Sequence, residues 1–211
     1  MPKDSLHHFY CASLASKIHG LLKASSILFQ SNFVMEAKIL TRSVLECLFR
    51  LAALSEDTGN LAAEILMSND AENLRRIKLI QDREGRQEHA VRSCEGRIKD
   101  WASKGIKLRE LSNYTLAELA GLTALYRTHY LFYSWNAHGD GVELEQFIAK
   151  DKDGKVAGII LEPIQNNIEN EAARLCLLSS VALKCFCKIF KISDEQAIKL
   201  QTTADHLLDG K

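Results

Sequence analysis

The sequence predicts an all-α protein, a multi-helix bundle with a projecting charged helical hairpin and one small β-hairpin. Two observations predict the helices. Pro2 and Pro163 are the only prolines in 211 residues, and apolar residues recur at helical spacing through most of the chain. A third observation predicts the β-hairpin, because two β-prone runs flank Asp153-Gly154, which is a strong turn signal.

The apolar periodicity sets the expected elements. Helices are predicted over 4–29, 33–54, 59–67, 70–82, 87–104, 115–138, 164–190 and 194–208, and the β-hairpin over 143–162. A lone two-stranded hairpin is only marginally stable in water, so we expect it to lie on the helical body as a packing element or a lid. The chain is expected to form one domain, 1–211, with 69–109 as an inserted helical arm.

The arm is the most basic part of the chain. It carries eleven basic residues against seven acidic ones, and its pattern predicts a helical hairpin turning near Gly85. Charge-rich helices are usually solvated surface, and RNA or partner binding is the alternative interpretation.

Composition limits the classes of function. Lys plus Arg and Asp plus Glu both number 27, so a nucleic-acid partner would need a local basic patch. No apolar run reaches the ~18–20 residues of a membrane span, so no membrane contact is expected. The six cysteines lack Cys-x-x-Cys spacing and no secretory leader is seen, which predicts a cytoplasmic protein. No metal or cofactor is expected, since the familiar ligand motifs are absent.

A charged pair lies within the apolar helix 33–54. Arg42 and Glu46 are four residues apart on it, and Arg50 follows one turn later. A helix that is apolar nearly all round is central and packed on several sides. Breaking a buried ion pair costs ~3–5 kcal/mol, so Arg42 and Glu46 must satisfy each other or meet polar partners from another helix.

The stretch "YRTHYLFYSWNAHGD", residues 126–140, supplies such partners. Counting in fours along it gives Tyr126, Tyr130, Ser134 and His138. Arg127 falls between Ser134 and His138 on a helical wheel, whereas Phe132 and Trp135 are expected in the core. His138 is the strongest single candidate, because an unperturbed imidazole pKa of ~6.5 suits proton exchange.

Two hypotheses follow for this cluster. In the first, an enzyme or toxin-like defence domain acts on an anionic, phosphate-containing ligand such as RNA or a nucleotide. Arg42 binds the anion, His138 exchanges a proton and Glu46 orients His138. The expected substrate-binding residues are Tyr130, Ser134, Arg127 and Arg50. In the second, the cluster is structural and the protein is a non-catalytic binding or assembly module, with helical surfaces for homo-oligomers. The first hypothesis requires a site open to solvent and the second a closed network.

The same residues carry a resemblance. "RSVLE" (Arg42 to Glu46) and "YLFYSWNAHG" (Tyr130 to Gly139) resemble a bacterial family of helical domains of unknown function. That family has an Arg-x-x-x-Glu helix and a later Tyr-x-x-x-Ser-x-x-x-His helix. The resemblance implies that Arg42, Glu46, Tyr130, Ser134 and His138 form one site, and it names no reaction.

A looser likeness points to the HEPN group of helical, metal-independent ribonucleases. Their sites use an Arg and a His separated by four to six residues, and Arg83 and His89 in "REGRQEH" have that spacing. If the protein cleaves RNA, we expect Arg42 and His138 to meet across helices instead.

Overall fold

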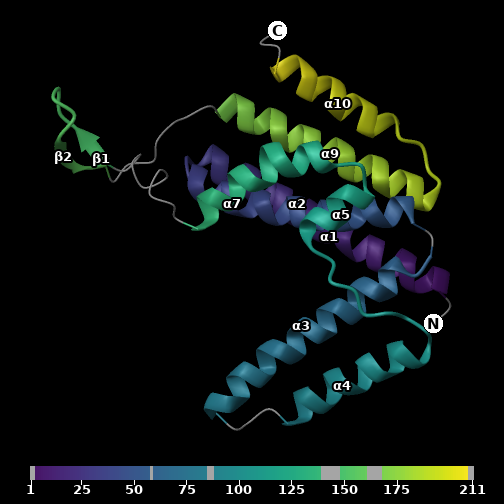
Figure 1. Ribbon diagram of the computed structural model, residues 1–211. Helices are drawn as coiled ribbons and strands as arrows, with labels where there is room; N and C mark the ends of the chain where they lie inside the picture. Colours follow the sequence, from purple (N-terminus) through teal and green to yellow (C-terminus); the bar gives the residue numbers. More distant parts are fainter. Residues whose placement is uncertain (1–2, 58, 85–87, 139–147, 161–167, 209–211) are drawn as a thin grey trace.

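The computed structural model describes residues 3–57, 59–84, 88–138, 148–160 and 168–208. Within them the protein is a helical bundle with one two-stranded antiparallel sheet (Figure 1), which confirms the all-α prediction. The helices are α1 (Lys3–Gln30), α2 (Val34–Glu56), α3 (Leu61–Glu84), α4 (Glu88–Ser103), α5 (Asn113–Leu119), α6 (Thr123–Leu125), the π-helix η1 (Tyr126–Tyr130), α7 (Leu131–His138), α9 (Ile168–Phe190) and α10 (Glu195–Leu208).

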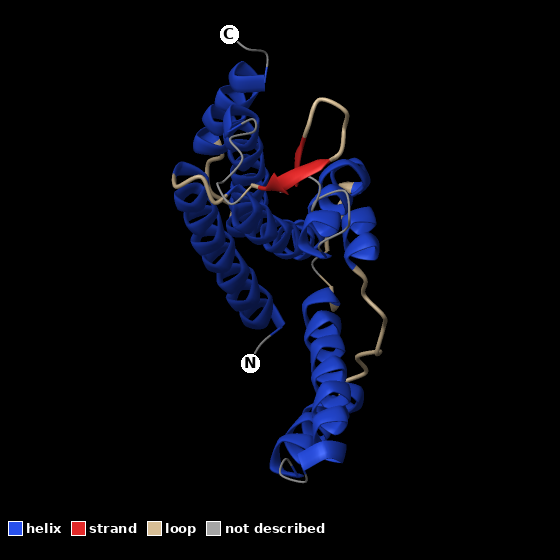
Figure 2. Cartoon of the chain, turned by 90° about the vertical axis from the view of Figure 1, so that its left-hand side faces the viewer, coloured by secondary structure: helices blue, strands red, loops and turns tan. Residues whose placement is uncertain are grey.

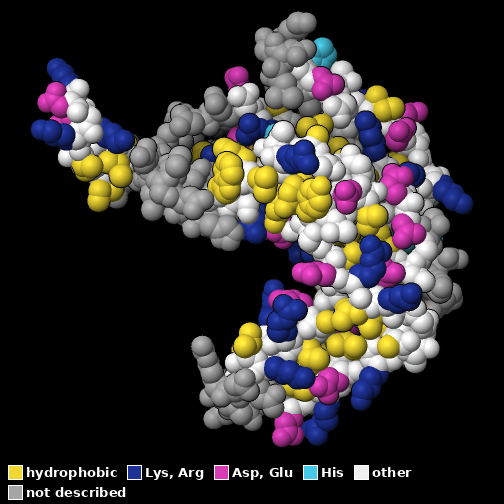
Figure 3. Space-filling model, viewed as in Figure 1, with side chains coloured by type: hydrophobic (Ala, Val, Ile, Leu, Met, Phe, Trp, Pro, Cys, Tyr) yellow, Lys and Arg dark blue, Asp and Glu magenta, His cyan; other side chains and the backbone are white. Residues whose placement is uncertain are grey.

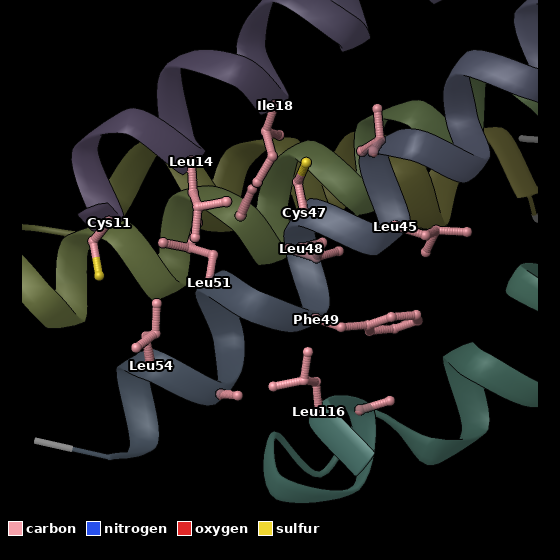
Figure 4. Packing of buried hydrophobic residues seen from close by; sticks show 14 of the residues in the cluster. Cys11, Leu14, Ile18, Leu45, Cys47, Leu48, Phe49, Leu51, Leu54 and Leu116 are labelled. Carbon is pink, nitrogen blue, oxygen red and sulfur yellow. The ribbon is translucent and has the colours of Figure 1, made fainter. Parts of the chain in front are cut away.

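Helix α2 is the centre of the bundle. It packs against α1, α5, α7 and α9, and twelve of its residues are buried. Figure 4 shows Leu14 and Ile18 of α1 beside Leu48 and Leu51 of α2, with Leu116 of α5 on the opposite side. Each fully buried side chain of this size contributes ~1.5–3 kcal/mol, so α2 is held by apolar contacts from several directions.

Helices α3 and α4 pair as a hairpin that projects from the bundle in two perpendicular views (Figures 1 and 2). The sequence predicted two helices over 59–67 and 70–82, and this is wrong, since α3 runs unbroken from Leu61 to Glu84. Neither Gly nor Pro interrupts this stretch. The polar residue at the expected break, Asp70, instead pairs with Arg97 of α4 at 2.7 Å.

The predicted helix 115–138 is broken after α5. Gly121 has a φ of 67°, which costs glycine little. Gly121 N donates to Glu118 O at 3.0 Å and Leu122 N to Ala117 O at 2.7 Å, which together form a Schellman motif that ends α5. The chain then resumes through α6 into the π-helix η1, where Leu131 N donates to Tyr126 O. Short π-helical turns are rare and often occur at functional sites.

The β-hairpin forms where the sequence placed it. Strand β1 (Ile148–Lys150) pairs with β2 (Val156–Ile159), and Asp151 Oδ1 accepts from Asp153 N and Lys155 N at 2.9 Å each. The expectation that it lies on the helices is wrong, because it stands apart from them in Figure 1. Its Val156 and Ile159 side chains are accordingly 70% and 76% exposed.

Candidate functional site

A row of charged side chains follows one side of α2, with Lys38, Arg42, Glu46 and Arg50 at four-residue intervals. Each step advances ~6 Å along the helix axis and turns ~40° around it. The row therefore begins beside α7, where Lys38 Nζ lies 5.3 Å from the Phe132 ring centroid. It ends at Arg50, which lines a groove formed with α1 and α3. Three members of this row, Arg42, Glu46 and Arg50, were predicted from the sequence, and Lys38 was not.

The carboxylate of Glu46 contacts both the Tyr130 hydroxyl and the Arg42 guanidinium. Its Oε1 accepts a hydrogen bond from Tyr130 Oη at 3.2 Å, and Tyr130 Oη in turn accepts from Asn113 Nδ2 at 2.9 Å. Arg42 Nε lies 3.4 Å from the same carboxylate oxygen, and Arg42 Cζ lies 5.7 Å from the Tyr130 ring centroid. The structure therefore brings Arg42, Glu46 and Tyr130 together, and adds Asn113, which the sequence analysis did not consider.

The Arg42–Glu46 pair is more open than its apolar helix suggested. The two side chains are 25% and 31% exposed, because the row lies along the edge of α2 that its neighbours cover only in part. Ion pairs with this access to solvent contribute ~0–1 kcal/mol. Within the described residues, Arg42 Nε and Asn113 Oδ1 are buried without a hydrogen-bond partner. One donor, Arg42 Nε, and one acceptor, Asn113 Oδ1, therefore have unused hydrogen-bonding capacity near Glu46.

Aromatic packing fixes the position of the Tyr130 hydroxyl. Tyr126 and Tyr130 stack with ring centroids 5.0 Å apart and an interplanar angle of 24°. Phe49 packs edge-on against Tyr130 at 5.8 Å, and Tyr114 against Tyr126 at 5.4 Å. Both stacked tyrosines belong to η1, so the π-helical turn and its aromatic neighbours set the angle at which Tyr130 meets Glu46.

A groove of about 470 Å³ lies between α1, α2 and α3 at the Arg50 end of the row. Its polar lining consists of Ser13, Lys17, Ser43, Glu46, Arg50 and Asn69, with Tyr10 at its side. Arg50 Nη1 donates to the backbone oxygen of Glu46 at 2.8 Å, which holds the guanidinium at the groove. Burial raises the pKa of the Cys47 thiol, while the nearby charges of Lys17 and Arg50 act in the opposite direction.

The cations of this groove differ from those of the arm. In the arm, carboxylates neutralise Arg76, Lys78, Arg97 and Lys104 at distances of 2.6 to 3.1 Å. Lys17 and Arg50 form no ion pair with any carboxylate that the structure describes. The groove therefore holds two cations, Lys17 and Arg50, that no described carboxylate pairs with.

The described residues do not place the other predicted residues in this cluster. Ser134 is half-buried and makes no hydrogen bond to Glu46 or Tyr130, and Arg127 is exposed. His138 is the last residue of α7, but its side chain falls outside the described part of the structure, as does that of Arg83. His89 is exposed on α4. The proposed contacts of His138 with Arg42 and Glu46 stay predictions.

A second polar cluster was missed altogether. Tyr133 Oη donates to Glu171 Oε2 at 2.6 Å, and Arg174 Nη1 donates to Glu171 Oε1 at 2.6 Å. Tyr133 is fully buried, and burial followed by the Glu171 charge raises its pKa far above the ordinary value. Burial, followed by the Arg174 charge, lowers the pKa of His129. The available signal was Glu171 and Arg174, two opposite charges three residues apart in the first half of a largely apolar helix.

Two further features of the described residues concern metal binding and membrane insertion. Across the described residues, no three His, Cys, Asp or Glu side chains gather as metal ligands. Among the helices that the structure describes, none has the length and apolar character to cross a membrane.

Comparison with known proteins gives the family. Neither the curated proteins nor the solved structures yield a match, and the looser likeness to HEPN ribonucleases gains no support. A family model covers residues 8–156, which include the whole charged row and the groove but not Glu171 or Arg174. The resemblance seen in residues 42–46 and 130–139 is confirmed, and the chain belongs to a family of unknown function, DUF5677.

Proposed function

We propose that the protein binds a small phosphate-containing ligand, of the nucleotide class, in the groove between α1, α2 and α3. The observation that carries the proposal is the pair of groove cations, Lys17 and Arg50, which no described carboxylate neutralises. Arginine and lysine beside a concave surface are the usual recognition groups for phosphate, because charge-assisted hydrogen bonds are the strong ones. On the arm, several of the cations pair with carboxylates, as Arg76, Lys78 and Arg97 do.

Glu46 gives the groove a second kind of recognition. Its Oε1 already receives Tyr130 and approaches Arg42, while no described residue donates to Oε2. A carboxylate oxygen at the wall of a groove accepts hydrogen bonds from hydroxyl or amino groups. Cations for a phosphate and an acceptor for a sugar or base are the combination that a nucleotide requires.

Solvent access favours a binding site over a purely structural cluster. A structural network is expected to exclude water and to satisfy all its polar atoms. Here Arg42 and Glu46 are 25% and 31% exposed, and Arg42 Nε has no hydrogen-bond partner among the described residues. Catalysis by Arg42, Glu46 and His138 stays a prediction, on which the binding proposal does not depend.

Calorimetric titration with adenosine monophosphate and with inorganic pyrophosphate tests the proposal. We expect Arg50→Ala and Lys17→Ala each to weaken binding at least tenfold. Arg50→Lys should lose less, because it keeps the charge but not the planar fork. The matched controls are Arg75→Ala on the arm and Lys199→Ala on α10, two exposed cations away from the groove.

The controls separate a site from general charge attraction. The four alanine variants each remove one positive charge, so non-specific attraction would weaken binding equally in all of them. Equal losses, or no binding of either probe by the wild-type protein, would contradict the proposal.

A further inference from the structure

Two large aromatic side chains are exposed on α7. Phe132 is 37% and Trp135 is 58% exposed, and their three-residue spacing places them on one face of the helix. The sequence predicted both in the core, which is wrong because Tyr130 and Tyr133, 7% and 0% exposed, occupy the inward positions. Both aromatic side chains therefore stay partly exposed to solvent on the same face of α7.

Cations from two other helices lie beside the Phe132 ring of this aromatic face. Lys38 Nζ of α2 lies 5.3 Å and Arg174 Cζ of α9 lies 5.8 Å from the centroid of the Phe132 ring. Arg174 is paired with Glu171, whereas Lys38 forms no ion pair with a described carboxylate. Figure 3 shows hydrophobic side chains gathered over α7 with Lys and Arg side chains beside them.

The aromatic face is joined to the proposed phosphate groove by α2 itself. Lys38, beside Phe132, begins the same row that passes Arg42 and Glu46 and ends at Arg50 in the groove. The twelve residues from Lys38 to Arg50 span ~18 Å along the helix axis. A mononucleotide is too short to occupy both ends, whereas a strand of a few nucleotides can reach from one end to the other.

We propose that the ligand is a single-stranded nucleic acid whose phosphates pair with the cations of the α2 row, Lys38, Arg42 and Arg50, and whose bases stack on Trp135 and Phe132. This inference rests on the proposed phosphate site and extends it to a polymer. Aromatic side chains combined with a cationic track are the general means of binding single strands, because every base presents a stacking face. A duplex hides those faces and is excluded from stacking.

The chain allows a direct optical test. It holds two tryptophans, Trp101 on α4 and Trp135 on α7, so Trp101→Phe leaves Trp135 as the sole tryptophan fluorophore. Titration of that variant with an eight-nucleotide oligouridylate should quench the fluorescence, and an eight-base-pair duplex should not. Titration with uridine monophosphate should leave the Trp135 emission nearly unchanged.

Affinity for the same labelled strand, measured by fluorescence anisotropy, completes the test. We expect Trp135→Ala to weaken binding at least tenfold and to leave mononucleotide binding intact. Phe9→Ala, which removes an aromatic side chain that is 64% exposed on α1, is the matched control and should change nothing. Lys38→Ala should lower the slope of log affinity against log salt concentration by about 0.7, the value for one phosphate of a single strand.

Several outcomes would overturn the inference, and they differ from failure of the phosphate site. If strand binding depends on Arg50 but is the same in Trp135→Ala and Phe9→Ala, the groove proposal survives and the stacking face is refuted. If neither strand nor mononucleotide binds, both fall. If Trp135→Ala leaves strand affinity unchanged but turns a dimer into a monomer in sedimentation, the aromatic face joins two copies of the chain instead.

Discussion

Tyr130 and Tyr133 lie one helical turn apart, and each donates a hydrogen bond to a glutamate on another helix. In both cases an arginine on the helix of that glutamate contacts the same carboxylate. Around Glu171 both contacts are 2.6 Å long and the glutamate side chain is 5% exposed. Around Glu46 the corresponding distances are 3.2 and 3.4 Å and the side chain is 31% exposed. The same residue types are thus arranged once as a closed cluster and once as an open one.

The difference shows what each cluster can do. In the closed cluster, Tyr133 and Arg174 each bond one oxygen of Glu171, so the carboxylate joins α7 to α9 and lies away from solvent. In the open cluster one oxygen of Glu46 receives Tyr130 while the other faces no described donor. Residue identity alone does not distinguish the two clusters, whereas the exposure of the glutamate does.

The largest expected effect is on stability, in the closed cluster. Glu171→Ala leaves the Arg174 charge and the buried Tyr133 hydroxyl without their acceptor, so we expect a loss of about 3–5 kcal/mol in the free energy of unfolding. Glu46→Ala should cost less than about 1 kcal/mol, because the open pair is partly hydrated. Urea denaturation of both variants measures the difference. Similar losses in the two would show that the open cluster is structural after all.

The tyrosines test the same contrast by removing one oxygen atom each. Tyr133→Phe leaves a buried carboxylate with one partner fewer, and a hydrogen bond to a charged group is worth about 1.5–3 kcal/mol. Tyr130→Phe should cost under about 1 kcal/mol, since water reaches Glu46 in its place. Thermal unfolding of the two variants ranks them, and an equal shift in midpoint would refute the distinction.

A smaller effect is expected from pH. The pKa of His129 is lowered from its ordinary value of 6.5, first by burial and then by the Arg174 charge, while Glu171 acts in the opposite direction. Between the lowered pKa and 6.5 the unfolded chain binds more protons than the folded one. Stability should therefore fall as the pH drops from 7 through this window and level off below it.

The variant His129→Gln isolates that contribution. It should lose less stability than the wild type between pH 7 and pH 5.5, when both are measured by urea denaturation. His206→Gln, an exposed histidine on α10, is the control and should follow the wild-type profile. Parallel profiles for wild type and His129→Gln would show that the environment of His129 is the same in the folded and unfolded states.

The fold was largely readable from local sequence patterns, and its departures have local causes. Apolar periodicity located α1, α2, α4, α9 and α10 to within a few residues, because each buries a continuous apolar stripe. The break at Gly121 was not expected, since a single glycine within a periodic run is compatible with either a helix or a Schellman cap. The predicted gap near Asp70 was wrong because this stretch contains no Gly or Pro, and a polar residue such as Asp70 fits on the helix surface, where it pairs with Arg97.

Only the contacts of the site that follow from the spacing of residues along one helix could be predicted from the sequence. Arg42 and Glu46 meet because four residues bring side chains together on any helix. Tyr130 rather than Ser134 reaches Glu46, and Tyr130 lies in the π-helical turn at 126–130, which no simple periodicity indicates. Lys17 was missed for a different reason, since it lines the groove only beside residues of α2 and α3, which are distant from it in sequence.

The smallest effect is expected at Arg127, which the sequence placed among the substrate-binding residues. The structure leaves this side chain exposed on η1, away from the groove lining. Arg127→Ala should therefore change the free energy of unfolding by less than about 0.5 kcal/mol, as for most exposed substitutions. It should also leave pyrophosphate affinity within twofold of the wild-type value by calorimetry. A tenfold loss would mean that the bound anion lies over η1 and Tyr130 rather than in the groove, and would move the site to the Arg42 side of the row.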